Sequence, residues 1–189
     1  MESRNTNFLQ FLKMRISSPL TILFLLFLLQ QTLLTAMADI QLIKNTCKGT
    51  PSSSLCLKIL LADPKSQNAD LTGLALIGVD AVNNKGLEIL EQIVALKKSR
   101  PELRPALDHC AEVYLAVVDG DVPSSRDALR SGVAKFAEQG MADSAVEAQV
   151  CEGSFGEHGR TSPMTGSNNA MIDVANVVRA IVHILLYGK

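Results

Sequence analysis

The chain has 189 residues, of which 18 are basic and 19 acidic, so its formal net charge is −1. Without the N-terminal segment 1–38, 15 basic and 18 acidic residues remain among 151, and the net charge is near −3. This charge argues against nucleic acid or an anionic lipid surface as the partner, because both attract cationic proteins. The length fits one domain with one sizeable core.

The first 38 residues carry the features of a cleavable export signal in their usual order. Basic residues precede an almost wholly apolar run at 20–29, and Ala36-Met37-Ala38 supplies the small residues of a cleavage site. The apolar core of about ten residues is shorter than the roughly 20 that span a bilayer. We therefore predict a signal peptide at 1–38 rather than an uncleaved anchor, and a mature domain at 39–189 without membrane attachment.

Beyond residue 38, apolar residues recur at helical spacing and runs of alternating β-branched residues are almost absent. This pattern predicts an all-α domain. Two short helices are expected first, at 40–48 and 52–61, with Gly49-Thr50-Pro51 between them as a stop signal and a helix-opening proline. Together they would form an N-terminal helical hairpin at 39–64.

Longer amphipathic helices are expected downstream. Asp70 is the expected N-cap of the first, which runs to about Ser99. Along it, the following residues recur at a mostly helical spacing: Leu74, Ile77, Ala81, Leu87, Leu90, Val94 and Lys97. The second helix starts near Pro101 and Pro105, and Asp119-Gly120-Asp121 is expected to interrupt it. Residues at steps of three or four on this helix are Leu107, Cys110, Tyr114 and Val117.

A short helix at 123–130 and a break at Ser131-Gly132 are expected before the third long helix. This helix is predicted to run from about Lys135 through Cys151. After it, Gly153-Ser154-Phe155-Gly156 followed by a histidine resembles an ordinary helix-ending loop. The third helix is therefore expected to stop before this glycine-containing segment.

The last helix is expected to start at Ser162 or Asn168 and to end at Leu186, and Ser162-Pro163 offers an N-cap and a first-turn proline. One face of this helix carries Met171, Val174, Val178, Ile181 and Leu185. Four long amphipathic helices with short connections favour an up-and-down four-helix bundle at 70–189, with the hairpin as an extension.

The four cysteines all follow the predicted signal. An even number in an exported chain is typical of a disulfide framework rather than of metal or catalytic thiols. Four cysteines allow three pairings. Cys47 and Cys56 flank the hairpin turn, and Cys110 and Cys151 lie on the second and third helices of the bundle, so we select these two pairs.

No catalytic motif of the common hydrolase, phosphate-binding or zinc types occurs in the sequence, and we expect no catalytic residue, cofactor or metal site. His109 lies beside Cys110, but neighbouring helical residues point about 100° apart and Cys110 is expected to be oxidised. His183, in an apolar stretch, is expected to be a structural imidazole. Two carboxyl pairs fit solvated surfaces or caps, namely Glu88 with Glu91 and Asp119 with Asp121. This pattern favours a binding protein over an enzyme.

Several segments spread over nearly the whole of 39–189 resemble the plant invertase and pectin methylesterase inhibitor family. The matching segments are Cys47-Lys48-Gly49-Thr50-Pro51 through Leu55-Cys56-Leu57, Leu60 to Ser66, Ala106 to Cys110 with Tyr114, Cys151 to Phe155, and Ser162 to Thr165. The resemblance implies a helical hairpin on a four-helix bundle and two disulfides paired as above. It also implies noncovalent inhibition of a carbohydrate-active enzyme in the plant cell wall (apoplast) or vacuole.

One further segment, Ala134 to Asp143, distinguishes the two branches of this family. It is similar to the segment of invertase inhibitors in which a Pro-Lys-Phe motif enters the sucrose-binding cleft of the enzyme. Lys135 and Phe136 match that motif, and Ala134 replaces its proline. Because pectin methylesterase inhibitors generally lack this segment, the resemblance implies acid invertase (β-fructofuranosidase) as the partner and residues 134–136 as the target contact.

The chemistry of Lys135 and Phe136 agrees with this role. Retaining glycosidases use two closely spaced carboxyl groups, so a lysine ammonium in such a cleft would meet negative charge. The phenyl ring could bury apolar surface where a sugar face normally binds. Without the resemblance, ordinary packing and a solvated cation would be the simpler interpretation of a Lys-Phe pair that begins a helix.

Three alternatives stay open at this point. The same scaffold could inhibit pectin methylesterase through helix faces, with Lys135 and Phe136 outside the contact. The chain could be a small thiol enzyme that uses His109 and Cys110, or a secreted helical module with no enzyme target. The export signal does not distinguish the apoplast from the vacuole.

Overall fold

The computed structural model describes residues 19–188, apart from the side chains of Leu29 and of residues 31–39. The basic residues of the predicted signal lie outside this range. The chain divides into two compact units, Met1–Gln41 and Leu42–Lys189. All regular elements of the described residues are helical, which confirms the predicted all-α class.

Helix α2, Pro19–Lys48, ends at the predicted residue but begins far upstream of the predicted start at residue 40. The apolar residues from Leu20 to Leu28 belong to this helix because leucine is a strong helix former, and most of their side chains are exposed. The predicted signal peptide is therefore helical over its described part. Its cleavage stays a prediction.

The second unit begins with the predicted helical hairpin. The last residues of α2 are followed by α3, Ser53–Ala62, which Ser52 caps by accepting a hydrogen bond from the backbone N–H of Leu55. A disulfide joins Cys47 to Cys56 across the turn. The Ser53 hydroxyl donates to the carbonyl of Cys47 at 2.8 Å. A short 3-10 helix, η1 (Pro64–Asn68), which was not predicted, leads out of the hairpin.

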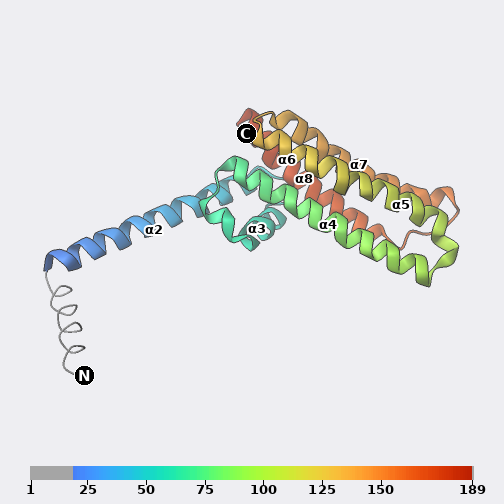
Figure 1. Cartoon of the computed structure of the whole chain (residues 1–189), viewed down its shortest axis with the longest axis horizontal. Coiled ribbons are helices and arrows are strands. Elements are labelled where there is room, and N and C mark those ends of the chain that lie inside the picture. The colour runs from blue at the N-terminus through green and yellow to red at the C-terminus, as the bar shows by residue number, and fades with distance from the viewer. Residues whose placement is uncertain (1–18, 189) are drawn as a thin grey trace, which may run out of the picture. The chain divides into compact units, whose positions relative to one another are not determined.

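The rest of this unit is a bundle of long helices. In chain order its elements are α4 (Leu71–Ser99), η2 (Pro101–Leu103), α5 (Arg104–Ala116), η3 (Val117–Asp121), α6 (Val122–Arg130), α7 (Ala134–Glu157) and α8 (Thr165–Tyr187). Figure 1 shows consecutive long helices running in opposite directions, as expected for an up-and-down bundle. Helix α8 packs between α4 and α7, and α5 and α6 pack against α7.

Most of the predicted core faces are confirmed. Leu107, Cys110, Tyr114 and Val117 are fully buried, and so are Met171, Val178 and Ile181 on α8. Helix α8 is also the one helix among the described residues that is long and apolar enough to cross a membrane. Its apolar face instead forms part of the core of the bundle.

The predicted core face of α4 is wrong in its second half. Leu87 and Val94 are 44% and 54% exposed, whereas Ile89 and Ile93 are buried. The buried stripe runs through Gly78 and Gly86, where an added Cβ would lie 2.9 Å from Val178 and 2.8 Å from Val118. These glycines let neighbouring segments approach closely. A pattern built on large apolar residues alone therefore selects the wrong stripe.

The predicted interruption at Asp119-Gly120-Asp121 is a change of helix type and not a break in the helix. These residues form the π-helical turn η3, which joins α5 to α6 without a break. A tertiary contact accompanies the turn, because the Ser144 hydroxyl of α7 lies 3.1 Å from Oδ2 of Asp121. The polar triplet is therefore partly built into the bundle instead of forming a solvated loop.

The end of α7 and the start of α8 also differ from the predicted positions. Helix α7 continues through Gly153-Ser154-Phe155-Gly156 to Glu157, because Ser154 and Phe155 are buried in the bundle. Helix α8 starts at Thr165, so Ser162 is not its N-cap. The Ser162 hydroxyl instead accepts from the backbone N–H of Met164 at 3.0 Å and donates to Glu152 at 2.8 Å.

Candidate target-binding surface

The Lys-Phe pair lies at the start of α7, directly after a hydrogen-bonded turn that ends α6. Gly132 has a φ of +77°, a conformation that glycine adopts without a steric penalty. Its N–H donates to the carbonyl of Leu129 at 3.3 Å, and the N–H of Val133 donates to that of Ala128 at 2.9 Å. This pattern is a Schellman motif, which fixes the direction in which the chain leaves a helix. The start of α7 is therefore held in a defined position.

The three predicted contact residues differ in exposure. Ala134, the first residue of α7, is buried at 6% exposure. Lys135 is exposed, and Phe136 is 65% exposed although it is a large apolar side chain. We call Lys135 and Phe136 the tip. The tip presents a cation and an aromatic ring to solvent, whereas Ala134 anchors it to the core.

A hollow of about 480 Å³ adjoins the tip. Lys135, Phe136 and Gln139 line it from α7, and Arg179 lines it from α8. Within the described part of the chain, neither Lys135 nor Arg179 has an ion-pair partner within 4 Å. The hollow therefore has at its edge two cations that lack an ion-pair partner among the described residues, the carboxylate of Glu138 and an apolar ring.

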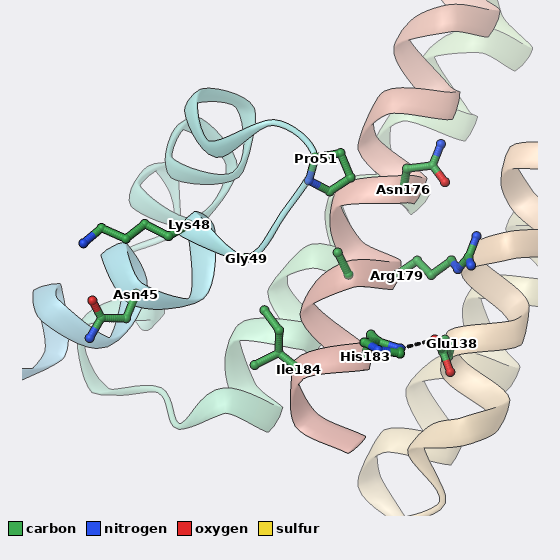
Figure 2. Close-up of a pocket in the computed structure, with 10 residues that line it drawn as sticks. Asn45, Lys48, Gly49, Pro51, Glu138, Asn176, Arg179, His183 and Ile184 are labelled. Atoms are coloured by element: carbon green, nitrogen blue, oxygen red, sulfur yellow. Dashed lines mark hydrogen bonds and ion pairs between the residues drawn. The ribbon is translucent and has the colours of Figure 1, made fainter. Parts of the chain in front are cut away.

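A second hollow, of about 910 Å³, lies between α8 and the hairpin turn. It shares Glu138 and Arg179 with the first hollow and reaches Gly49 and Pro51 of the hairpin. Figure 2 shows Arg179 extending from α8 toward α7, above the pair formed by His183 and Glu138. The two hollows thus form one continuous surface with Arg179 between them.

His183 makes structural contacts, as the sequence predicts, but its side chain lies at the surface of the bundle. Its ring is half-exposed, and Nδ1 lies 2.8 Å from Oε1 of Glu138. The ring also packs against Tyr187, with centroids 4.6 Å apart. The side chain lies on the solvent-facing side of α8, because Val182 and Ile181 take the core positions. Its apolar neighbours in the sequence thus face the core while His183 does not.

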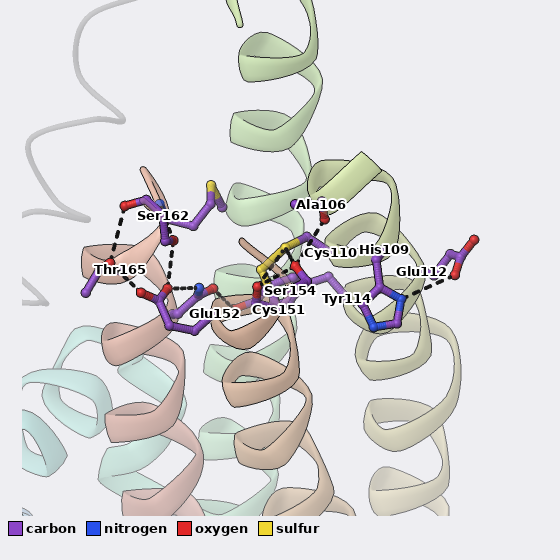
Figure 3. The surroundings of a disulfide bond; sticks show 12 residues. Ala106, His109, Cys110, Glu112, Tyr114, Cys151, Glu152, Ser154, Ser162 and Thr165 are labelled. Atoms are coloured by element: carbon purple, nitrogen blue, oxygen red, sulfur yellow. Dashed lines mark hydrogen bonds and ion pairs between the residues drawn. A yellow bond between two sulfur atoms is a disulfide. The ribbon is translucent and has the colours of Figure 1, made fainter. Parts of the chain in front are cut away.

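The surroundings of the other disulfide contain no reactive thiol. Cys110 is bonded to Cys151, and no cysteine is free. His109 is exposed on α5 and lies 3.7 Å from Glu112. Figure 3 shows His109 on the outside of α5, away from the sulfur atoms. A thiol enzyme built on His109 and Cys110 is therefore ruled out for this oxidised form.

Next to this disulfide, Glu152 ties the loop before α8 to α7 (Figure 3). Burial favours its neutral form, but hydrogen bonds from Thr165, Asn168 and Ser162 outweigh burial and lower the pKa of this carboxyl. Asn168 in turn accepts from the hydroxyl of Tyr114 at 2.7 Å. The network crosslinks α5, α7 and α8.

The carboxyl pairs behave differently from each other. Glu88 is exposed and pairs with Lys85, as predicted for a solvated surface. Asp121 is half-buried, and burial raises its pKa to about 6, with further contributions from Asp143 and Glu147. It is therefore not a solvated carboxyl, and it makes no capping hydrogen bond to α6, so neither of the two predicted roles fits it. Within the described residues, no group of three or more His, Cys, Asp or Glu side chains could hold a metal ion.

Comparison with known protein families identifies the family to which this fold belongs. Residues 41–183 match the family model described as plant invertase/pectin methylesterase inhibitor. The chain belongs to this family. The match extends from the last turns of α2 into α8 and so includes the hairpin and the bundle up to His183. The family description names inhibitors, which confirms the prediction of an inhibitor rather than an enzyme.

Three relatives illustrate the range of the family. The "Cell wall / vacuolar inhibitor of fructosidase 1" of Arabidopsis thaliana is 42% identical over 142 residues, which are 75% of this chain and 68% of that protein. The "Pectinesterase inhibitor" of Actinidia deliciosa is 27% identical, over 80% of this chain and 83% of the relative. A crystal structure of a pectin methylesterase inhibitor mutant from Arabidopsis shares the fold, with a TM-score of 0.59, 17% identity, and coverage of 73% of this chain and 93% of that one.

Sequence reasoning missed the α8 side of the surface. Arg179 and His183 were not singled out as contact residues, and Glu138 was noted only as part of the matching segment. Their positions could have been inferred, because Asn176, Arg179 and His183 recur at helical spacing opposite the apolar face of α8. That spacing predicts exposure, but it does not indicate that this stripe lies beside the start of α7.

Proposed function

We propose that this chain is an exported inhibitor of a plant acid invertase (β-fructofuranosidase) and that it binds noncovalently in the active-site cleft of the enzyme. The observation that carries the proposal is the exposed tip, in which Phe136 is 65% exposed beside Lys135. The similarity to the fructosidase inhibitor, at 42% identity, supports this branch of the family.

The tip has the chemistry that such a cleft would accept. The Lys135 ammonium has no ion-pair partner within the described residues, so it can pair with a cleft carboxylate without first losing another contact. The Phe136 ring can stack on the apolar surface that receives a sugar face. The Schellman turn keeps both side chains at the start of α7, which reduces the ordering that binding requires.

A double variant tests the proposal. We expect Lys135→Ala with Phe136→Ala to raise the inhibition constant against acid invertase at least about tenfold, which is about 1.4 kcal/mol. The matched control is Val94→Ala with Lys98→Ala, which removes an exposed apolar residue and an exposed cation from α4. The helical circular dichroism of both variants should match that of the wild type. An unchanged inhibition constant for the tip variant would reject cleft insertion by the tip.

The alternative target is pectin methylesterase. The 27% identical pectinesterase inhibitor supports it, although the similarity is lower than to the fructosidase inhibitor. Separate titrations of the purified protein into acid invertase and pectin methylesterase distinguish the two targets. Loss of pectin demethylation with unaltered sucrose cleavage would establish the alternative, and the opposite result would support the invertase proposal. No effect on either enzyme would indicate a helical module with another partner.

We also propose that the protein is delivered to the cell wall or vacuole after removal of residues 1–38. The name of the 42% identical relative mentions both locations, and the exposed apolar residues of α2 between Leu20 and Leu28 suit a signal sequence. N-terminal sequencing of the protein from plant tissue should find Asp39 as the first residue. Protein that retains the apolar helix would contradict cleavage.

A further inference from the structure

The tip is too small to account for a stable complex by itself. One aromatic side chain buries about 150–250 Å², whereas a specific interface takes about 800 Å² from each partner. The partner must therefore contact surface beside the tip. This inference rests on the proposed function, in which the partner is an acid invertase. The face beside the tip that the enzyme covers follows from the two hollows.

Arg179 connects the tip to the rest of this face, because it lines both hollows. It lines the first hollow together with Lys135 and Phe136, so a partner that encloses the tip from this side also meets Arg179. It lines the second hollow as well, which continues past His183 to Pro51 of the hairpin. Arg179 is exposed and has no ion-pair partner within 4 Å among the described residues. Arg179 is thus a cation that lines both concave parts of this face, as the carboxylate of Glu138 also does.

The charges of this face are unlike those of the whole chain. The chain is slightly acidic, yet the side chains that line the two hollows include the cations Lys48, Lys135 and Arg179 against the carboxylate of Glu138. The face is therefore complementary to an acidic surface. The active-site cleft of a glycosidase contains paired carboxyl groups, so a cationic face suits a partner that binds around such a cleft.

We propose that the target-binding interface extends from the tip across α8 to the hairpin turn and that Arg179 is a steering cation of this interface. The partner is the acidic rim around the active-site cleft of the same enzyme. Because Arg179 lies at an exposed edge, its charge acts mainly on the rate of association and on the salt dependence of that rate. The tip is buried in the complex and acts mainly on the rate of dissociation.

Association kinetics with a purified acid invertase test this proposal. We expect Arg179→Glu to lower the association rate constant about tenfold at low salt, with a dissociation rate constant within about twofold of wild type. The charge-retaining variant Arg179→Lys should stay within about threefold of the wild-type association rate. At 1 M salt, where the Debye length is about 3 Å, the deficit of Arg179→Glu should shrink to within about twofold.

The matched control is Arg160→Glu, an equal charge reversal at an exposed residue near the opposite end of α7 and α8. If Arg179→Glu and Arg160→Glu bind with the same rate constants, the extended interface is refuted. The proposed function would still stand in that case, provided that the tip variant loses inhibition. A wild-type protein that does not bind acid invertase would refute both the proposed function and this inference.

Discussion

Asp121 offers a quantitative test of the packing between η3 and α7. Burial raises the pKa of its carboxyl from 3.8 to about 6, so the folded state holds a proton more tightly than the unfolded state does. The linkage between protonation and folding then has a definite sign. The contribution of this group is most favourable below about pH 4 and is lost as the pH rises through about 6.

The magnitude follows from the same pKa values. One pKa unit corresponds to about 1.4 kcal/mol, so a rise from 3.8 to about 6 sets an upper bound of about 3 kcal/mol. Because the carboxyl is only half-buried, solvent screening reduces the expected effect to about 1–2 kcal/mol. Asp121→Asn keeps an acceptor for the Ser144 hydroxyl and removes the charge.

Urea unfolding of wild type and Asp121→Asn between pH 4 and 8 measures this effect. We expect the variant to gain about 1–2 kcal/mol relative to wild type as the pH rises from 4 to 7. The control is Asp119→Asn, an exposed carboxyl in the same π-helical turn, which should show no such trend. A difference between wild type and Asp121→Asn that stays constant over this pH range would refute the raised pKa of Asp121.

Two further predictions concern the Glu152 network and the start of α7. Glu152→Gln should lower the free energy of unfolding by about 1–3 kcal/mol, because it weakens three hydrogen bonds to a charged acceptor; an unchanged urea midpoint would show that the network contributes nothing. Ala134→Pro places proline at the first helical position, where no intrahelical hydrogen bond is lost. It should stabilise the fold by about 0.4–1 kcal/mol and lower the inhibition constant about two- to fivefold; weaker inhibition by a fully folded variant would contradict a role for preorganisation.

The elements that the sequence predicted correctly have local signals. Asp70 caps α4, and Gly132 adopts a positive φ between α6 and α7, at the predicted break. The structure forms the disulfides Cys47–Cys56 and Cys110–Cys151, the two pairs selected from their places on the predicted helices. Each of these features depends on a residue type at a defined place in the chain, so it can be recognised before the fold is known.

The errors arise where a distant segment decides the local structure. Gly78 and Gly86 belong to the core stripe of α4 only because Val178 and Val118 pack against them. Asp119-Gly120-Asp121 continues a helix, and its last residue contacts Ser144, which lies 23 positions further along the chain. Propensity and spacing carry no information about these partners, so they predict a different face and a break.

The candidate surface likewise contains residues that the sequence identifies and a residue that only the fold identifies. Lys135 and Phe136 could be named from the sequence because they belong to a short segment that resembles a known one, and the structure places them at an exposed helix start. Arg179 could not be assigned to the same surface from the sequence, because α8 lies beside the start of α7 only in the folded bundle. The resemblance identifies the tip, whereas the extent of the surface follows from the fold.

The most direct test of the central claim is the dependence of inhibition on substrate concentration. If Lys135 and Phe136 occupy the sugar-binding cleft of acid invertase, sucrose and the inhibitor exclude each other. The apparent inhibition constant should then rise in proportion to the sucrose concentration above KM, and the maximal rate should be unchanged. An apparent inhibition constant that is independent of sucrose, with a reduced maximal rate, would contradict binding in the cleft.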